Sequence, residues 1–321
     1  MNFHDMEMRG VYAKTLKEFM DKNPNVVCLE ADLGKSSGTV PEIQEKHENR
    51  FIECGVSEAN MICIAAGLAK EGKIPFCSSF TSFATRRVYD QVTISVAYAN
   101  NNVKIVGTAP GITNGPNGGT HICFEDLSIM RAMPNMHVYS PCDPYELRSV
   151  LNHMMGEHQP TYMQLIRLKV DPIFNGQYQF DPNKAVILHN GDDVTLVSTG
   201  YMTQFALKAA RDLASSGTGV DLIHYPSIKP FDVETLVKSA RRTQAVVTVE
   251  NQNIIGGLGG AVCETLSEIH PTKVMRLGIT DQFGEVATQQ YFFDKYGFGP
   301  EHIASACRKM SKTGAVYQNK V

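Results

Sequence analysis

The chain of 321 residues is long enough for two domains that each bury a core, and its 43% hydrophobic and 20% charged residues are typical of a globular protein. A net charge of −3, with both signs spread along the chain, argues against nucleic acid and membrane as partners, and no apolar run approaches the ~20 residues that cross a bilayer. Eight cysteines without a Cys-x-x-Cys pair, and a start that lacks the basic and apolar character of a leader, predict a reduced, cytoplasmic protein without structural zinc.

Short apolar runs alternate with helical patterns in the first half of the chain. Strands are predicted at 26–29, 74–77, 103–106 and 162–166, and helices near 7–21, 57–71, 85–99 and 143–154. This alternation predicts a mostly parallel sheet that is covered by helices on both faces.

Residues 171–185 contain two prolines and one glycine without a helical period, which predicts a linker. The alternation then restarts, with strands predicted at 194–197, 220–223, 245–249 and 273–277 and helices near 203–216, 233–241, 257–269 and 300–311. The sequence therefore predicts two consecutive three-layer α/β domains with mostly parallel sheets, over residues 1–170 and 188–321, joined by a linker over 171–187.

Glu58 precedes the apolar run 61–69, at the start of a predicted helix. A carboxyl group buried there would stay protonated near neutrality and could donate to a ligand nitrogen. Alternatively, it is an N-terminal acid that complements the helix dipole.

Phe80 and Phe83 lie three residues apart, after a predicted strand. Two aromatic faces beside the acid Glu58 could hold a flat heteroaromatic ring by stacking, with the carboxyl group fixing its orientation. The alternative is ordinary core packing at helical spacing.

Residues 108–121 form a long loop with four glycines and two prolines after a predicted strand. Ligand-binding loops of α/β sheets follow the carboxyl ends of strands, so His121 at the end of this loop is a candidate proton shuttle or donor to a substrate oxygen. Otherwise it is a solvated loop histidine.

Arg9, Ser36 and Arg167 are far apart in the sequence. Brought together, two guanidinium groups and a hydroxyl group could bind a phosphate or another tetrahedral oxyanion. Apart, they are surface charges and a turn serine.

Taken in order, these segments resemble the C-terminal two-domain half of transketolases, from Arg9 to about Met310. The motifs that carry the resemblance are Glu30-Ala31-Asp32-Leu33, the Glu58 segment, Arg87-Val88-Tyr89-Asp90-Gln91, Gly119-Thr120-His121 with Glu125-Asp126, Arg131-Ala132-Met133-Pro134-Asn135-Met136, and Ile254 through Gly260. The resemblance implies a pyrimidine-binding domain followed by a transketolase C-terminal domain.

The resemblance also implies the cofactor and the role of each matching residue. Transketolases use thiamine diphosphate to move a two-carbon ketol unit from a ketose to an aldose. Glu58 would bond the aminopyrimidine ring as a catalytic group, Phe80 and Phe83 would stack on that ring, and Asp32 would lie near the cofactor. The positions that would contact the sugar phosphate are those of Arg9, Ser36, Asn117, His121 and Arg167, with His121 also catalytic.

The full-length enzymes hold the diphosphate and Mg²⁺ through a Gly-Asp-Gly…Asn motif in a further N-terminal domain. This chain lacks that motif, since Gly191-Asp192-Asp193 has no second glycine. We therefore expect one subunit of a split transketolase, without metal ligands of its own, completed by an N-terminal subunit in an α2β2 heterotetramer.

Several positions depart from the family pattern. Members usually carry histidine where this chain has Ala109, Glu-Asp where it has Pro116-Asn117, and glutamine where it has Ala59 and Ile122. The changes at 109 and 117 fall on substrate positions, so we expect altered sugar specificity, as for an unusual ketose phosphate or a sulfonated analogue.

Two other interpretations remain open. The β subunit of a 2-oxoacid dehydrogenase shares the domain pair and the glutamate, and Gly115-Pro116-Asn117-Gly118 resembles its loop, although Gly119-Thr120-His121 and the 87–91 run favour transketolase. A non-catalytic partner subunit is the third interpretation, which the retention of Glu58 with Phe80 and Phe83 argues against.

Overall fold

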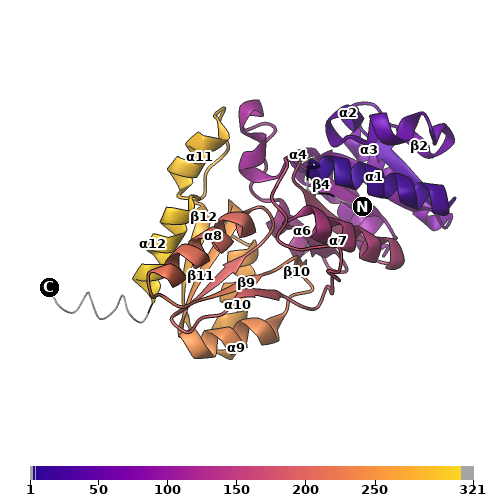
Figure 1. The fold of residues 1–321 in the computed structure, drawn as a ribbon. Helices are drawn as coiled ribbons and strands as arrows, with labels where there is room; N and C mark the ends of the chain where they lie inside the picture. Colours follow the sequence, from indigo (N-terminus) through magenta and orange to yellow (C-terminus); the bar gives the residue numbers. More distant parts are fainter. Residues whose placement is uncertain (1–2, 4, 312–321) are drawn as a thin grey trace.

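A computed structural model describes residue 3 and residues 5–311; residues 1, 2, 4 and 312–321, which the predicted domain ranges include, lie outside the described residues. Two sheets, each flanked by helices, make up the fold (Figure 1). The first part of the chain, indigo to magenta, lies at the upper right of that view, and the orange-to-yellow second part lies at the lower left.

The first sheet follows directly from the alternation of apolar runs. Its spatial order is β10 (Ser227–Lys229), β5 (His137–Tyr139), β6 (Thr161–Leu165), β4 (Lys104–Thr108), β3 (Ile74–Phe80), β1 (Val26–Glu30) and β2 (Phe51–Glu53). All pairs are parallel except β10 with β5. Every residue of β1, β4 and β6 is buried, as expected of strands covered by helices on both faces.

Helices cover both faces of this sheet. One face carries α1 (Met8–Lys22) and α7 (Pro144–Gly156), and the other carries α3 (Glu58–Lys70), α6 (Asp126–Ala132) and the helical segment 86–98. Short helices α2 (Gly34–Ser37) and α4 (Thr81–Ala84) follow β1 and β3. The single helix predicted near 85–99 is wrong in detail, because Thr85 donates its hydroxyl to the Thr81 carbonyl and breaks the helical backbone before a 3₁₀ turn, α5 (Tyr89–Gln91) and a wide helical turn 92–98.

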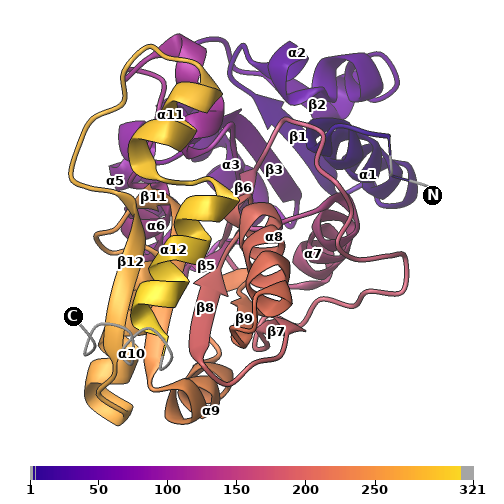
Figure 2. The same ribbon diagram turned by 60° about the vertical axis from the view of Figure 1, so that its left-hand side comes forward.

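The second sheet has the order β12 (Lys273–Ile279), β11 (Ala245–Asn253), β8 (Val194–Ser198), β9 (Val220–His224) and β7 (Val186–His189), with β7 antiparallel. Figure 2 shows α8 (Met202–Ser215) and α12 (Pro300–Met310) side by side on one face. The other face carries α9 (Val233–Thr243) and α10 (Leu258–Ile269), while α11 (Gln289–Tyr296) lies toward the first sheet. No helix among the described residues is long and apolar enough to span a membrane.

The two halves share a hydrophobic core and a buried polar contact. One apolar cluster joins residues of the first sheet, such as Ile105, to residues of α9 and α10, such as Leu236. At the same boundary His224 Nε2 lies 2.8 Å from Glu146 Oε2, and both side chains are fully buried. Burial alone would raise the pKa of Glu146, but the facing His224 outweighs it and lowers that pKa.

Glu146 also satisfies its remaining acceptor positions. It accepts hydrogen bonds from the Cys142 backbone N–H and the Tyr178 hydroxyl, each at 2.8 Å. Cys142, Glu146 and His224 have the residue types of a metal site, but their polar atoms bond one another and make a contact that connects the two halves.

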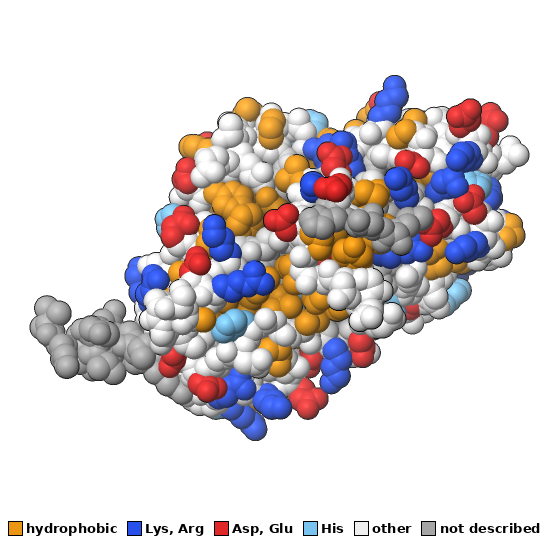
Figure 3. Space-filling model, viewed as in Figure 1, with side chains coloured by type: hydrophobic (Ala, Val, Ile, Leu, Met, Phe, Trp, Pro, Cys, Tyr) orange, Lys and Arg blue, Asp and Glu red, His pale blue; other side chains and the backbone are white. Residues whose placement is uncertain are grey.

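Charged side chains are mixed over the molecular surface. On the face in Figure 3, lysine and arginine side chains alternate with aspartate and glutamate side chains, with apolar patches between them. The surface charge on this face is therefore dispersed.

Candidate active site

The candidate residues gather at the edge of the first sheet where the carboxyl ends of its parallel strands meet. Strands β6, β4, β3 and β1 are neighbours. Arg167 follows β6, His121 ends the loop after β4, Phe83 follows β3, and Ser36 follows β1. This edge is where ligands bind in open α/β sheets, because the loops leave all strands on one side.

Glu58 is the first residue of α3 and only 4% exposed. Its Oε1 accepts a hydrogen bond from Arg87 Nη1 at 2.8 Å. The sequence had indicated a protonated acid in an apolar pocket, whereas the structure pairs the carboxylate with a guanidinium group. The helical segment 86–98 packs against α3, and this brings Arg87 to the start of that helix.

Phe80 ends β3 and Phe83 lies in α4, one turn further on. Their ring centroids are 5.9 Å apart, and the imidazole of His121 meets both rings edge-on, with centroids 5.2 Å from Phe83 and 6.2 Å from Phe80. The acid, the two phenylalanines and the histidine therefore form one cluster, which the sequence could suggest but not measure.

Arg87 links the acid to this cluster. Its Cζ lies 3.8 Å from the centroid of the Phe83 ring, so the guanidinium group stacks on that ring while it bonds Glu58. In the sequence Arg87 stood out only as part of a motif, with no role of its own. The one available signal was its place in an arginine pair four residues after Phe83.

The loop that carries His121 is held at several points. The 3₁₀ segment Gly111–Asn117 places Asn114 so that its Nδ2 donates to the His121 carbonyl at 2.9 Å, and Asn117 Nδ2 donates to Asn114 Oδ1 at 2.7 Å. Ser82 Oγ donates to the same carbonyl at 3.1 Å. Asn117, which is exposed, is thus connected to His121 through Asn114.

Ala109, at the start of this loop, has φ of 55° and is buried. A left-handed backbone at a residue other than glycine stores strain and is most common at functional sites. The position where transketolases usually carry histidine is therefore conformationally constrained in this chain.

Arg9, Ser36 and Arg167 come together as a group, which we call the arginine cradle. Arg167 Nη1 donates to Ser36 Oγ at 2.5 Å, and Arg9 Nη1 donates to the Ser36 carbonyl at 3.2 Å. Burial, together with the nearby charge of Arg9, lowers the pKa of Arg167. Two like charges held this close are stabilised by a bound anion.

The cradle adjoins the aromatic cluster, because the Arg167 Cζ lies 5.0 Å from the Phe80 ring centroid. Asp32 lies exposed on the turn after β1, with φ of 60°, and its backbone N–H donates to Glu53 Oε1 at 2.7 Å. Asp32 is therefore on the same sheet edge as the cradle.

Glu30 supports the turn that presents Ser36, although no role for it was predicted from the sequence. It is fully buried, and its Oε1 accepts hydrogen bonds from Ser37 Oγ and Thr39 Oγ1, both at 2.6 Å. Burial raises the pKa of Glu30 to about 8, so the side chain is protonated near neutrality. The acid that behaves as a buried neutral group is thus Glu30.

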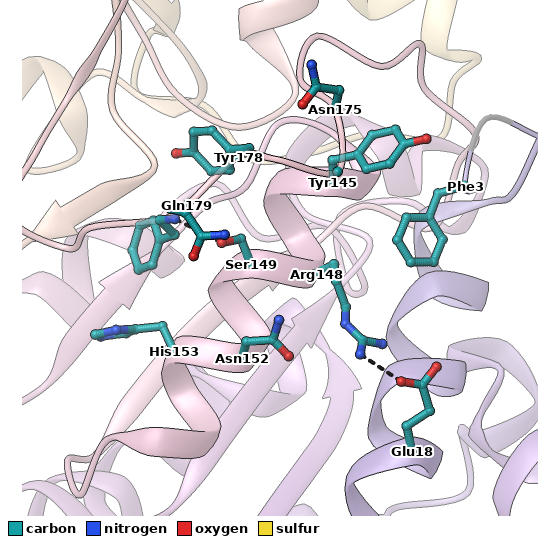
Figure 4. Close-up of a pocket in the computed structure, with 12 residues that line it drawn as sticks. Phe3, Glu18, Tyr145, Arg148, Ser149, Asn152, His153, Asn175, Tyr178 and Gln179 are labelled. Atoms are coloured by element: carbon teal, nitrogen blue, oxygen red, sulfur yellow. Dashed lines mark hydrogen bonds and ion pairs between the residues drawn. The ribbon is translucent and has the colours of Figure 1, made fainter. Parts of the chain in front are cut away.

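A cavity of about 600 Å³ lies elsewhere, between α1, α7 and the segment that joins the two halves (Figure 4). Arg148 and Glu18, drawn with a dashed line, form an ion pair of 2.7 Å at its side. Tyr145 and Ser149 of α7 also line it, and none of the candidate residues does. The candidate site is an open sheet edge and not this cavity.

Comparison with known families covers most of the chain. Residues 4–171 match the transketolase pyrimidine binding domain, and residues 183–303 match the transketolase C-terminal domain. The chain belongs to the transketolase family. The predicted fold class, two mostly parallel α/β domains of this family, is confirmed.

Individual transketolase relatives match along almost the whole chain. The protein described as 6-deoxy-6-sulfo-D-fructose transketolase subunit SqwH, from Clostridium sp. (strain MSTE9), is 45% identical over 95% of this chain and 94% of its own length. One of the subunits of the apulose-4-phosphate transketolase of Phocaeicola vulgatus is 32% identical over 95% of this chain and 97% of its own.

A solved structure described as a split gene transketolase, inactive beta4 tetramer, is also similar to this transketolase-family chain. It superposes with a TM-score of 0.86 and 38% identity, covering 95% of this chain and 98% of the other. These relatives favour a transketolase subunit over both a 2-oxoacid dehydrogenase β subunit and a non-catalytic partner.

Proposed function

We propose that this chain is the C-terminal subunit of a two-subunit transketolase that moves a two-carbon ketol unit from a ketose phosphate or ketose sulfonate to an aldose phosphate. The observation that carries the proposal is the meeting, at one sheet edge, of an acid beside stacked aromatics and a pair of arginines. The first group suits a heteroaromatic cofactor ring, and the second suits the charged end of a sugar.

Thiamine diphosphate is the cofactor that membership of this family implies. The residues present fit its aminopyrimidine half, because the Arg87 guanidinium, also a planar group with N–H donors, bonds Glu58 and stacks on Phe83. When bound, this cofactor supplies the carbanion chemistry that a ketol transfer needs. Glu58 would bond the ring edge, Phe80 and Phe83 would fix the plane of the ring, and Asp32 would lie near it.

His121 is proposed to act on the substrate. Its imidazole stands against both phenylalanine rings, and Thr120 Oγ1 lies 2.8 Å from its Nδ1, which leaves Nε2 for a substrate oxygen. A histidine so placed can donate or accept the proton of a hydroxyl or carbonyl group during carbon–carbon bond cleavage. Asn117 would contact the same substrate from the neighbouring turn.

The arginine cradle is proposed to bind the phosphate or sulfonate of the sugar. Arg9, Ser36 and Arg167 offer donors around one point, and an oxyanion there would relieve the repulsion between the two guanidinium groups. The relative named for 6-deoxy-6-sulfo-D-fructose makes a sulfonated ketose a candidate donor. Phosphate and sulfonate are both tetrahedral oxyanions, so the cradle suits either.

A second, N-terminal subunit is proposed to supply the diphosphate and Mg²⁺ site in a cytoplasmic α2β2 heterotetramer. The relatives named as subunits, and the tetramer of the split gene transketolase, support an assembly of this kind. On this proposal the chain alone neither binds thiamine diphosphate with micromolar affinity nor turns over sugars, and calorimetry on the isolated chain tests the first point.

The function is tested by co-purifying the chain with its partner and assaying ketol transfer from phosphorylated and sulfonated ketoses. Glu58→Gln should abolish turnover in that complex, while Glu45→Gln, at an exposed position of the same domain, should leave it unchanged. Unchanged turnover in Glu58→Gln would support a non-catalytic role for this chain. Release of CO₂ from a 2-oxoacid would instead support the dehydrogenase.

A further inference from the structure

The Arg87 side chain makes both of the contacts that the proposed function assigns to the cofactor ring. Its Nη1 donates to Glu58 Oε1 at 2.8 Å, and its Cζ stands 3.8 Å from the centroid of Phe83. A guanidinium group is planar and edged with N–H donors, so it resembles the amino-substituted edge of a pyrimidine in shape and in hydrogen bonding.

The two occupants exclude each other. A separation of 3.8 Å is ordinary van der Waals contact, which leaves no space for a ring between the guanidinium group and Phe83. Glu58 is only 4% exposed, so a ligand reaches its carboxylate from the side that Arg87 occupies.

Arg87 is also free to leave, since its side chain is 46% exposed although its partner is buried. Its neighbour Arg86 is placed differently. Arg86 Nη1 bonds Glu125 Oε1 at 2.9 Å, and Arg86 Nη2 donates to the carbonyls of Gly119 and Thr120. Of the adjacent arginines, one therefore anchors a loop and the other covers the acid.

We propose that Arg87 is a positioning residue that closes the aminopyrimidine site in the isolated chain, by holding Glu58 and covering Phe83 until the ring displaces it. The inference rests on the proposed function for the identity of the ring. A ligand that must first open a closed site binds more weakly, by the fraction of molecules that are open. Removal of the Arg87 guanidinium should therefore strengthen binding of the ring.

The test uses the full chain and the aminopyrimidine half of the cofactor alone, 4-amino-5-hydroxymethyl-2-methylpyrimidine, so that no partner is needed. Affinity is measured by titration calorimetry or ligand-observed NMR. We expect Arg87→Ala to bind this probe about tenfold more tightly than the parent chain, which corresponds to the loss of one partly exposed ion pair with its cation–π contact. Arg86→Gln is the matched control and should bind as the parent does.

Two further variants complete the design. Arg87→Lys keeps the charge but loses the planar fork, so its affinity should lie between those of the parent and Arg87→Ala. In Glu58→Gln/Arg87→Ala the gain should disappear, because the acceptor is lost. If circular dichroism shows that Arg87→Ala is unfolded, Arg87→Gln takes its place.

The inference is overturned if removing the guanidinium leaves the affinity for the probe unchanged or weakens it, since Arg87 would then be inert or a wall of the site. Its failure is distinct from failure of the proposed function. Ketol transfer by the reconstituted complex, with no gain in probe affinity, would refute only the closure by Arg87. A gain that depends on Glu58, in a complex without ketol transfer, would support the closure and refute the transketolase activity.

Discussion

Glu30 gives a prediction about stability and pH that can be worked through in numbers. Burial raises the pKa of Glu30 from 4.5 to about 8 in the folded chain. Between these values the folded state keeps a proton that the unfolded state releases, so the free energy of unfolding falls as the pH rises through this window. From pH 6 to pH 9 the fall covers about two pH units, at about 1.4 kcal/mol each, which is about 3 kcal/mol.

The variant Glu30→Gln isolates this contribution, because its amide oxygen can still accept from Ser37 and Thr39 but cannot ionise. Urea unfolding of parent and variant at pH 6 and pH 9 should show the difference between them shifting by about 3 kcal/mol in favour of the variant. Glu45→Gln, at an exposed position, should show no such shift. A difference that stays constant between the two pH values would refute the protonated, buried state of Glu30.

Three further outcomes follow from the same contacts. His224→Gln leaves Glu146 buried without its imidazole and should lower the free energy of unfolding by about 3 kcal/mol in urea titrations, whereas a loss below ~1 kcal/mol would contradict a buried ion pair. Arg167→Ala should raise the KM of the complex for a phosphorylated or sulfonated ketose ~10- to 100-fold, with a smaller change in kcat, and an equal loss for an uncharged ketose would argue against the cradle. His121→Ala should lower turnover by ~10²-fold or more while cofactor affinity, measured by calorimetry, changes little, and the reverse pattern would remove His121 from the substrate site.

The sequence predicted the architecture because each central strand is a continuous apolar run. The runs at 26–29, 103–106 and 194–197 lie along β1, β4 and β8, all fully buried. Short edge strands could not be predicted in this way: β10 has only three residues, and its pairing with β5 depends on how the two halves dock. Such docking leaves no periodic signal in the local sequence.

The candidate site was predicted in its parts and missed in its connections. The positions of Ser36, His121 and Arg167 could be anticipated, since each follows a strand of one parallel sheet. The pairing of Glu58 with Arg87 could not, because it depends on the packing of two helical segments. The roles assigned to these residues stay predictions until the variants above are measured.

The addition of β10 to the first sheet has a consequence for experiments on fragments. A chain cut within residues 171–185 would lose this outer strand and leave the backbone N–H and C=O groups along one side of β5 open to pairing with other molecules. It would also uncover apolar side chains such as Ile105 and Leu236, which now pack in a cluster common to both halves. Expression trials that divide the polypeptide at its connecting segment should therefore yield aggregated material, and biochemical work is best done with the intact chain.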